Sequence, residues 1–130
     1  MQVVTKTWDE PMDGTSTDWA NLPTPMALEI DVPTGVTQMM IFVQMSRVQH
    51  DTGNVNTQFR IMAESTQVSW TNTGNATGWA FRPLSLNGVF PVSAGQNIDI
   101  EVQYVTESGT VQWVSNADGF QERQLTVLMF

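Results

Sequence analysis

Residues 96–104 read QNIDIEVQY, and their alternation of polar and apolar residues from Asn97 to Tyr104 constrains most strongly what this chain can fold into. Successive side chains of an extended strand point to opposite faces, so Ile98, Ile100 and Val102 share one face and the polar residues between them share the other. An amphipathic helix would need a period of about 3.6 residues instead. The segment is therefore predicted to be a half-buried β-strand.

Several other segments read as strands. Residues 26–32, MALEIDV, are closed by the turn residues PTG, and residues 38–45, QMMIFVQM, are apolar on both faces. Turn clusters such as Asn87-Gly88 separate the candidates, and no amphipathic helical stretch is long enough to cross between parallel strands. The pattern predicts an all-β, antiparallel two-sheet sandwich of about eight strands. The remaining strand candidates are residues 3–8, 56–63, 79–82, 110–114 and 123–130.

The first 25 residues differ from the rest of the chain. After the strand candidate at residues 3–8, residues 9–25 combine four carboxylates with three prolines and show little periodicity. We expect residues 1–25 to form an N-terminal strand and an extended acidic arm, and residues 26–130 to form the sandwich domain. The acidic stretch is either a surface loop pinned by Trp19 or an arm that reaches a neighbouring subunit.

Charge narrows the choice of partners. Thirteen acidic residues against five basic ones give a formal net charge of −8, and Lys6 is the only lysine. A surface of this sign repels phosphate backbones and anionic lipid head groups, because binding either one relies on clustered cations. We therefore expect neither nucleic acid nor membrane as a partner. The chain has no cysteine, so its folding relies on packing and hydrogen bonding.

The sequence gives little support for catalysis. His50, the only histidine, lies beside Asp51 at a predicted turn, and such a pair can transfer protons. No recognisable motif places a nucleophile near it, and there is no second histidine for a metal, so we interpret it as an ordinary loop histidine. The acidic residues of the N-terminal arm do not have the spacing of a calcium loop. We expect no enzymatic activity, no cofactor and no bound metal.

Aromatic residues beside turns suggest a carbohydrate site. Tryptophan rings next to asparagine and aspartate side chains hold sugar rings in many β-sandwich lectins. The alternative is that these rings fill the core or a subunit interface. The possible sugar-binding residues are Trp70, Asn75, Trp79, Trp113 and Asp118.

The C-terminal segment RQLTVLMF is apolar on both faces up to its last residue. Chain ends usually fray in water, so an apolar end of this kind should be buried centrally. A two-sheet domain buries only one face of each strand, which leaves the other face for a partner subunit. We infer a homo-oligomer whose interface includes Met40 and Phe42 from the 38–45 segment and Leu128 and Phe130 from the C-terminus.

Three segments resemble tumour-necrosis-factor-like and complement globular-head jelly rolls. IDVPTGVTQMMIFVQM looks like their strand, Pro-x-Gly turn and apolar strand, VFPVSAGQNIDIEVQYV resembles a later Gly-polar turn with an alternating strand, and QLTVLMF resembles their closing strand. The resemblance implies a jelly-roll sandwich that forms trimers. A short, acidic, cysteine-free chain rich in Gln, Asn and Thr is similar, within this fold class, to bacteriophage head decoration (cement) proteins.

This resemblance implies a structural virion protein. Such a chain would be made in the host cytoplasm, bind the outer capsid surface as a homotrimer, contact the major capsid protein and stabilise the shell. The alternative is a carbohydrate-binding or receptor-binding jelly-roll module, such as a tail-fibre tip or a lectin-like domain, with a glycan as partner. Under the decoration reading, the capsid-binding residues lie in the N-terminal strand and arm: Val3, Val4, Trp8, Asp9, Glu10, Asp13 and Asp18.

Overall fold

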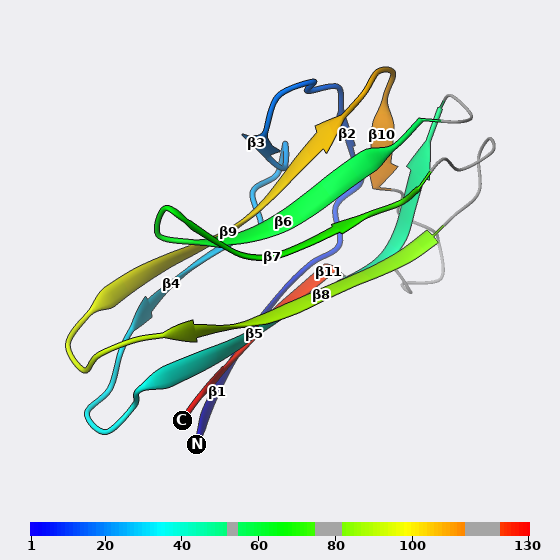
Figure 1. Ribbon diagram of the computed structural model, residues 1–130. Helices are drawn as coiled ribbons and strands as arrows, with labels where there is room; N and C mark the ends of the chain where they lie inside the picture. The colour runs from blue at the N-terminus through cyan, green and yellow to red at the C-terminus, as the bar shows by residue number, and fades with distance from the viewer. Residues whose placement is uncertain (52–54, 75–81, 114–122) are drawn as a thin grey trace.

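The computed structural model describes residues 1–51, 55–74, 82–113 and 123–130 of this chain. It is an all-β fold of two antiparallel sheets, so the predicted fold class is confirmed (Figure 1). We call the six-stranded sheet sheet A and the five-stranded sheet sheet B. The strands are β1 (Gln2–Trp8), β2 (Met12–Gly14), β3 (Ala20–Asn21), β4 (Ala27–Asp31), β5 (Gln38–His50), β6 (Thr57–Ala63), β7 (Thr66–Asn72), β8 (Arg82–Pro91), β9 (Asn97–Thr106), β10 (Val111–Trp113) and β11 (Arg123–Met129).

Strand β5 organises sheet A, because its 13 residues are long enough to reach several partners. Its first part pairs with β11 on one edge and with β8 on the other, and its last residues pair with β10. Strand β1 pairs with β11, and β2 pairs with β10. The pairing of β5 with β8 shifts register between Met45 and Val48, where β5 changes its partner on the other edge.

Strand β9, the segment with the clearest alternation, is central in sheet B. It pairs with β6 on one edge and with β4 and then β3 on the other, while β7 pairs with β6. The residues of β9 predicted to share one face, Ile98, Ile100 and Val102, are all buried. The polar residues that alternate with them, Asn97, Asp99, Glu101 and Gln103, lie on the outer face of the sheet.

The core lies between the two sheets and is built from alternate residues of the strands. Trp113 lies in this core with 1 % of its surface exposed, and its ring meets those of Phe59 and Tyr104 edge-on, at centroid distances of 6.1 Å and 5.2 Å. The indole Nε1–H of Trp113 points to the Met45 sulfur at 3.3 Å. This aromatic group joins residues of both sheets, because Trp113 and Met45 belong to sheet A and the other two belong to sheet B.

The sheets approach closely where β8 passes β7. A Cβ atom placed on Gly88 would lie 2.6 Å from a methyl carbon of Val68 and 2.7 Å from its main-chain oxygen. Only glycine fits at this position without movement of β7. Asn87-Gly88 is predicted from the sequence to be a turn, whereas the structure places both residues inside β8.

The first 25 residues differ from the expected arm because they take part in both sheets. Strand β1 pairs along its whole length with β11, β2 adds to sheet A, and β3 adds to sheet B. Met12 and Leu22 are core residues, with 8 % and 1 % of their surfaces exposed. These two core positions could not be predicted from the sequence, because strands of two and three residues are too short to show the alternation of apolar and polar residues.

Candidate functional site

An apolar row crosses four strands on the outer face of sheet A. Val3 of β1 pairs with Leu128 of β11, Leu128 pairs with Met40 of β5, and Met40 pairs with Val89 of β8. Directly paired residues of neighbouring strands point to the same face of a sheet. Val3 is 59 % exposed and Val89 is 47 % exposed, while the two central residues are half-buried. We call these four residues the apolar row.

The rows on either side extend this surface. On one side Phe42 pairs with Thr126 and Asn87, and the hydroxyls of Thr5 and Thr126 lie 3.2 Å apart. On the other side Phe130 is 46 % exposed and pairs through its main chain with Gln38. The described side chains of these three rows carry no charge, although the chain as a whole has a net charge of −8.

The structure therefore brings the four predicted interface residues, Met40, Phe42, Leu128 and Phe130, onto one face. Of the other two members of the apolar row, Val3 was predicted to bind a capsid and Val89 was not predicted in any site. Val3 and Val4 are adjacent in a predicted strand, so their side chains are expected on opposite faces and one of the two on the outer face. Val89 could not be placed from sequence, because the turn predicted at Asn87-Gly88 directly precedes it and hides the strand that continues through these residues.

The residues predicted to bind a capsid do not form one surface. Val4 and Trp8 pack against the core, whereas Val3 points outward. The side chains of Asp9, Glu10, Asp13 and Asp18 are exposed, but they are distributed over β2 and the segments on either side of it. The prediction assumed a free arm, whereas in the structure the strands β1 and β2 pair with sheet A and hold these residues apart.

The predicted sugar-binding residues have separate outcomes. Trp70 on β7 is exposed, with 46 % of its surface accessible. Trp113 is buried between the sheets, so its ring cannot be offered to a ligand at the surface. Asn75, Trp79 and Asp118 lie outside the described residues. Only Trp70 can therefore be assigned to a surface here.

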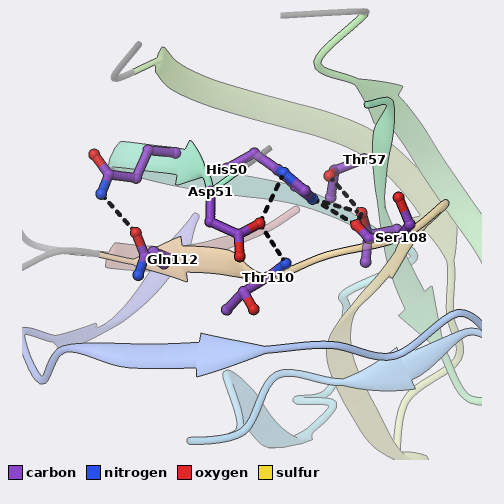
Figure 2. A network of polar contacts seen from close by, with 8 residues as sticks. His50, Asp51, Thr57, Ser108, Thr110 and Gln112 are labelled. Atoms are coloured by element: carbon purple, nitrogen blue, oxygen red, sulfur yellow. Dashed lines mark hydrogen bonds and ion pairs between the residues drawn. The ribbon is translucent and has the colours of Figure 1, made fainter. Parts of the chain in front are cut away.

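His50 ends strand β5 and is buried, which differs from the predicted loop position (Figure 2). Its Nε2 lies 2.7 Å from the main-chain oxygen of Ser108 and 3.1 Å from the Thr106 hydroxyl, and its Nδ1 lies 3.4 Å from an Asp51 carboxylate oxygen. A carbonyl oxygen only accepts, so Nε2 carries the proton in the contact with Ser108. The Thr57 hydroxyl donates to that of Thr106.

This polar network connects the two sheets, because His50 belongs to sheet A and Thr57 and Thr106 belong to sheet B. Only 6 % of the surface of His50 is exposed, and both nitrogens of its imidazole contact atoms of the protein itself. We interpret it as a structural crosslink at one end of the sandwich. Across the described ranges, no group of three or more His, Asp or Glu residues is placed to hold a metal ion.

Comparisons with known proteins identify the fold. No family model matches the sequence, and no curated protein matches it. Among solved structures, a chain of the infectious bursal disease virus Gx strain is similar with a TM-score of 0.56 and 16 % identity, over 97 % of this chain and 36 % of that one. The Eiger TNF of S. frugiperda is similar with a TM-score of 0.52 and 8 % identity, over 98 % and 92 % of the two chains.

A third similar structure is a chain of T=1 particles derived from infectious bursal virus, with a TM-score of 0.53 and 14 % identity over 97 % of this chain. This chain spans 36 % and 35 % of the two viral chains. Such distant likenesses show the fold alone, and the fold is that of a jelly roll. Within the described residues, no helix is long and apolar enough to cross a membrane.

Proposed function

We propose that this chain is a structural protein of a virus particle and that it assembles through the outer face of sheet A. The observation that carries the proposal is the apolar row with its uncharged flanking rows, which run across β1, β11, β5 and β8. The jelly-roll fold, which this chain shares with chains of virus structures, supports it. This role requires no catalytic residue.

The occupant of this face is a second copy of the chain, arranged around a three-fold axis as the resemblance implies. Two chains with a charge of −8 repel each other, so copies associate best where neither presents a charge. The apolar row meets this condition. Burial of apolar surface contributes about 25 cal/mol for each Å² removed from water, which favours contact along the row.

The finer proposal is that the trimer is a decoration (cement) protein on the outer capsid surface. A trimer that binds only the mature shell lowers the free energy of that state, and three linked contacts add avidity. Under this proposal the exposed carboxylates of Asp9, Glu10, Asp13 and Asp18 steer the encounter with the major capsid protein by long-range attraction, which does not require them to form one surface. The outer face of sheet B is not part of this assembly face.

Two methionines give a matched test of the assembly face. Met40 and Met62 are both half-buried on outer faces, Met40 on sheet A and Met62 on sheet B. Sedimentation velocity should show a trimer for the wild-type chain and for Met62→Asp, and a folded monomer for Met40→Asp. A wild-type monomer at micromolar concentration, or an intact trimer for Met40→Asp, would contradict assembly through sheet A.

A second experiment tests the virion role itself. Particles purified from the natural source of the chain should contain it, and shells stripped of it should gain heat resistance when the purified wild-type trimer is added. Met40→Asp should restore much less resistance, because a monomer lacks avidity. Absence of the chain from the particles would overturn the virion proposal even if the trimer were confirmed.

A further inference from the structure

A row of polar and aromatic side chains crosses the outer face of sheet B. Trp70 of β7 pairs with Arg60 of β6, Arg60 pairs with Gln103 of β9, and Gln103 pairs with Asn21 of β3. Neighbouring strands lie about 4.8 Å apart, so the row spans about 14 Å from β7 to β3. We call these four residues the platform row.

Trp70 offers a fixed aromatic plane at one end of the platform row. Its indole Nε1–H donates to the side-chain oxygen of Gln58 at 3.0 Å, which limits rotation of the ring. Nevertheless 46 % of the residue is exposed, which is unusual for so large an apolar side chain. The polar atom of the ring therefore has its partner within the protein, while part of the residue remains open to solvent.

Arg60 is held in place at the centre of the row. Its guanidinium lies 4.2 Å from the centroid of the Trp19 ring, and its Nε–H donates to the Gln103 side-chain oxygen at 2.8 Å. The Gln103 amide in turn donates to Asn21 at 3.3 Å. An arginine has five N–H donors, and within the described part of the chain one of those of Arg60 is used in a hydrogen bond. Arg60 is thus oriented while donors on its two Nη atoms remain for a ligand.

Carboxylates line the next part of the same face. Glu101 pairs with Met62 in the row beside the platform row, and Glu29 and Asp99 pair with each other further along. The face therefore places hydrogen-bond donors and an aromatic plane beside acceptor oxygens. Glu29 and Asp99 are exposed and Glu101 is half-buried, so this part of the surface repels an anionic ligand.

From this arrangement we infer that the outer face of sheet B binds a neutral oligosaccharide. One pyranose ring stacks on Trp70, and hydroxyl groups along the oligosaccharide accept hydrogen bonds from Arg60 and donate to Glu101. Sugar hydroxyls both donate and accept, so they match a surface that combines the two kinds of group. The length of the platform row suits several linked sugars rather than one, and the carboxylates select against acidic sugars. The site is separate from the assembly face on sheet A.

The test uses binding of defined sugars to the full chain. Cellotetraose, maltotetraose and chitotetraose serve as neutral probes, and tetragalacturonate serves as the anionic probe, each titrated by calorimetry and by NMR. At least one neutral probe should bind saturably at micromolar to millimolar concentration, and tetragalacturonate should bind at least tenfold more weakly. No saturable binding of any neutral probe, or preferred binding of tetragalacturonate, overturns the proposal.

Variants then assign the site. Trp70→Thr keeps a good strand former at an edge strand, and Arg60→Gln keeps a polar side chain; each should weaken binding of the neutral probe about tenfold or more. Lys6→Gln is the matched control, because Lys6 lies over the Trp8 ring at 5.1 Å in the same kind of pair on sheet A, and it should bind as the wild type does.

Folding and assembly are measured beside binding to separate the possible outcomes. Each variant should keep the melting transition and the sedimentation coefficient of the wild type, so loss of sugar binding will not reflect loss of the fold or of the oligomer. If Trp70→Thr unfolds, Gln58→Leu, which removes the partner of the indole N–H, provides the test and should weaken binding severalfold. Unchanged binding by a folded Trp70 variant or by Arg60→Gln would exclude the platform row as the site.

Discussion

The guanidinium Nη1 of Arg123 donates to the main-chain oxygen of Glu10 at 2.7 Å, and this bond ties the first residue of β11 to the segment that follows β1. Arg123 is only 3 % exposed, and its Nε and Nη2 have no hydrogen-bond partner among the residues that the structure describes. Burial lowers the pKa of Arg123, and the nearby carboxylates of Glu10 and Asp9 oppose that shift. A buried cation with two unpaired donors is costly to the folded state.

We therefore expect Arg123→Met and Arg123→Ala to differ. Methionine fills a similar volume and removes the buried charge, so the free energy of unfolding should change by less than about 1 kcal/mol or rise. Alanine leaves a cavity and should cost about 2–4 kcal/mol. Urea denaturation followed by circular dichroism measures both. Equal losses for the two variants would show that the charge and its bond to Glu10, rather than packing, stabilise this end of the sheet.

Neighbouring residues on β11 should respond in opposite ways to the same substitution. Val127→Asp places a carboxylate in the core, where Val127 has no exposed surface, and should unfold the chain because the cost is several kcal/mol. Leu128→Asp places the charge on the outer face of sheet A and should leave a folded monomer. Circular dichroism and light scattering distinguish these states. An intact trimer for Leu128→Asp would show that β11 is not at the interface.

Truncation of the N-terminus should damage the fold in two steps. Removal of residues 1–8 deletes β1 and leaves β11 as an exposed edge strand, so the shortened chain should be less stable and prone to aggregate. Removal of residues 1–25 also takes Met12 and Leu22 from the core, at about 1.5–3 kcal/mol each, and should leave no cooperative unfolding transition. A folded trimer of residues 26–130, seen by NMR, would restore the separate arm that the sequence suggested.

The close approach at Gly88 predicts a steric effect. Gly88→Ala should lower the free energy of unfolding by about 1–3 kcal/mol, because its methyl group would meet both a methyl and the main-chain oxygen of Val68. Val68→Ala in the same chain should recover part of the loss, since it removes the methyl contact but not the oxygen contact. Gly35, which has a φ of 87° and open space around it, is the control: Gly35→Ala should cost about 1 kcal/mol from backbone strain alone.

The parts of the fold that could be predicted from the sequence are the strands whose own residues show a clear pattern of apolar and polar positions. The alternation of β9 and the two apolar faces of β11 and β5 led to the right strands and to the clustering of Met40 and Leu128 on one face. The positions of Leu22 and Trp113 could not be predicted in this way. Leu22 follows a two-residue strand. Trp113 ends a strand of only three residues, in which the alternation with Val111 and Gln112 is too short to decide between the core and a subunit interface.

The platform row could not be predicted from sequence for a related reason. Trp70, Arg60, Gln103 and Asn21 come from four segments, and they become neighbours only when β7, β6, β9 and β3 pair in their particular registers. Trp70 alone was singled out, because it is a large aromatic residue near a turn. A register shift of one residue would turn each of these side chains to the other face.

The pairing of β1 with β11 also sets how quickly this fold can form. Thr5 and Thr126 lie side by side in the sheet, yet they are 121 positions apart, and the N and C ends of the chain are adjacent (Figure 1). Closing so long a loop is entropically costly, and the contacts that offset this cost form only after the rest of sheet A is in place. Refolding should therefore be slow, and β1 should dock late. A circular permutant that joins residue 130 to residue 1 by a short linker and opens the chain at Ser65, in the β6–β7 turn, would make this pairing local. It should refold faster than the natural order while keeping the same native contacts.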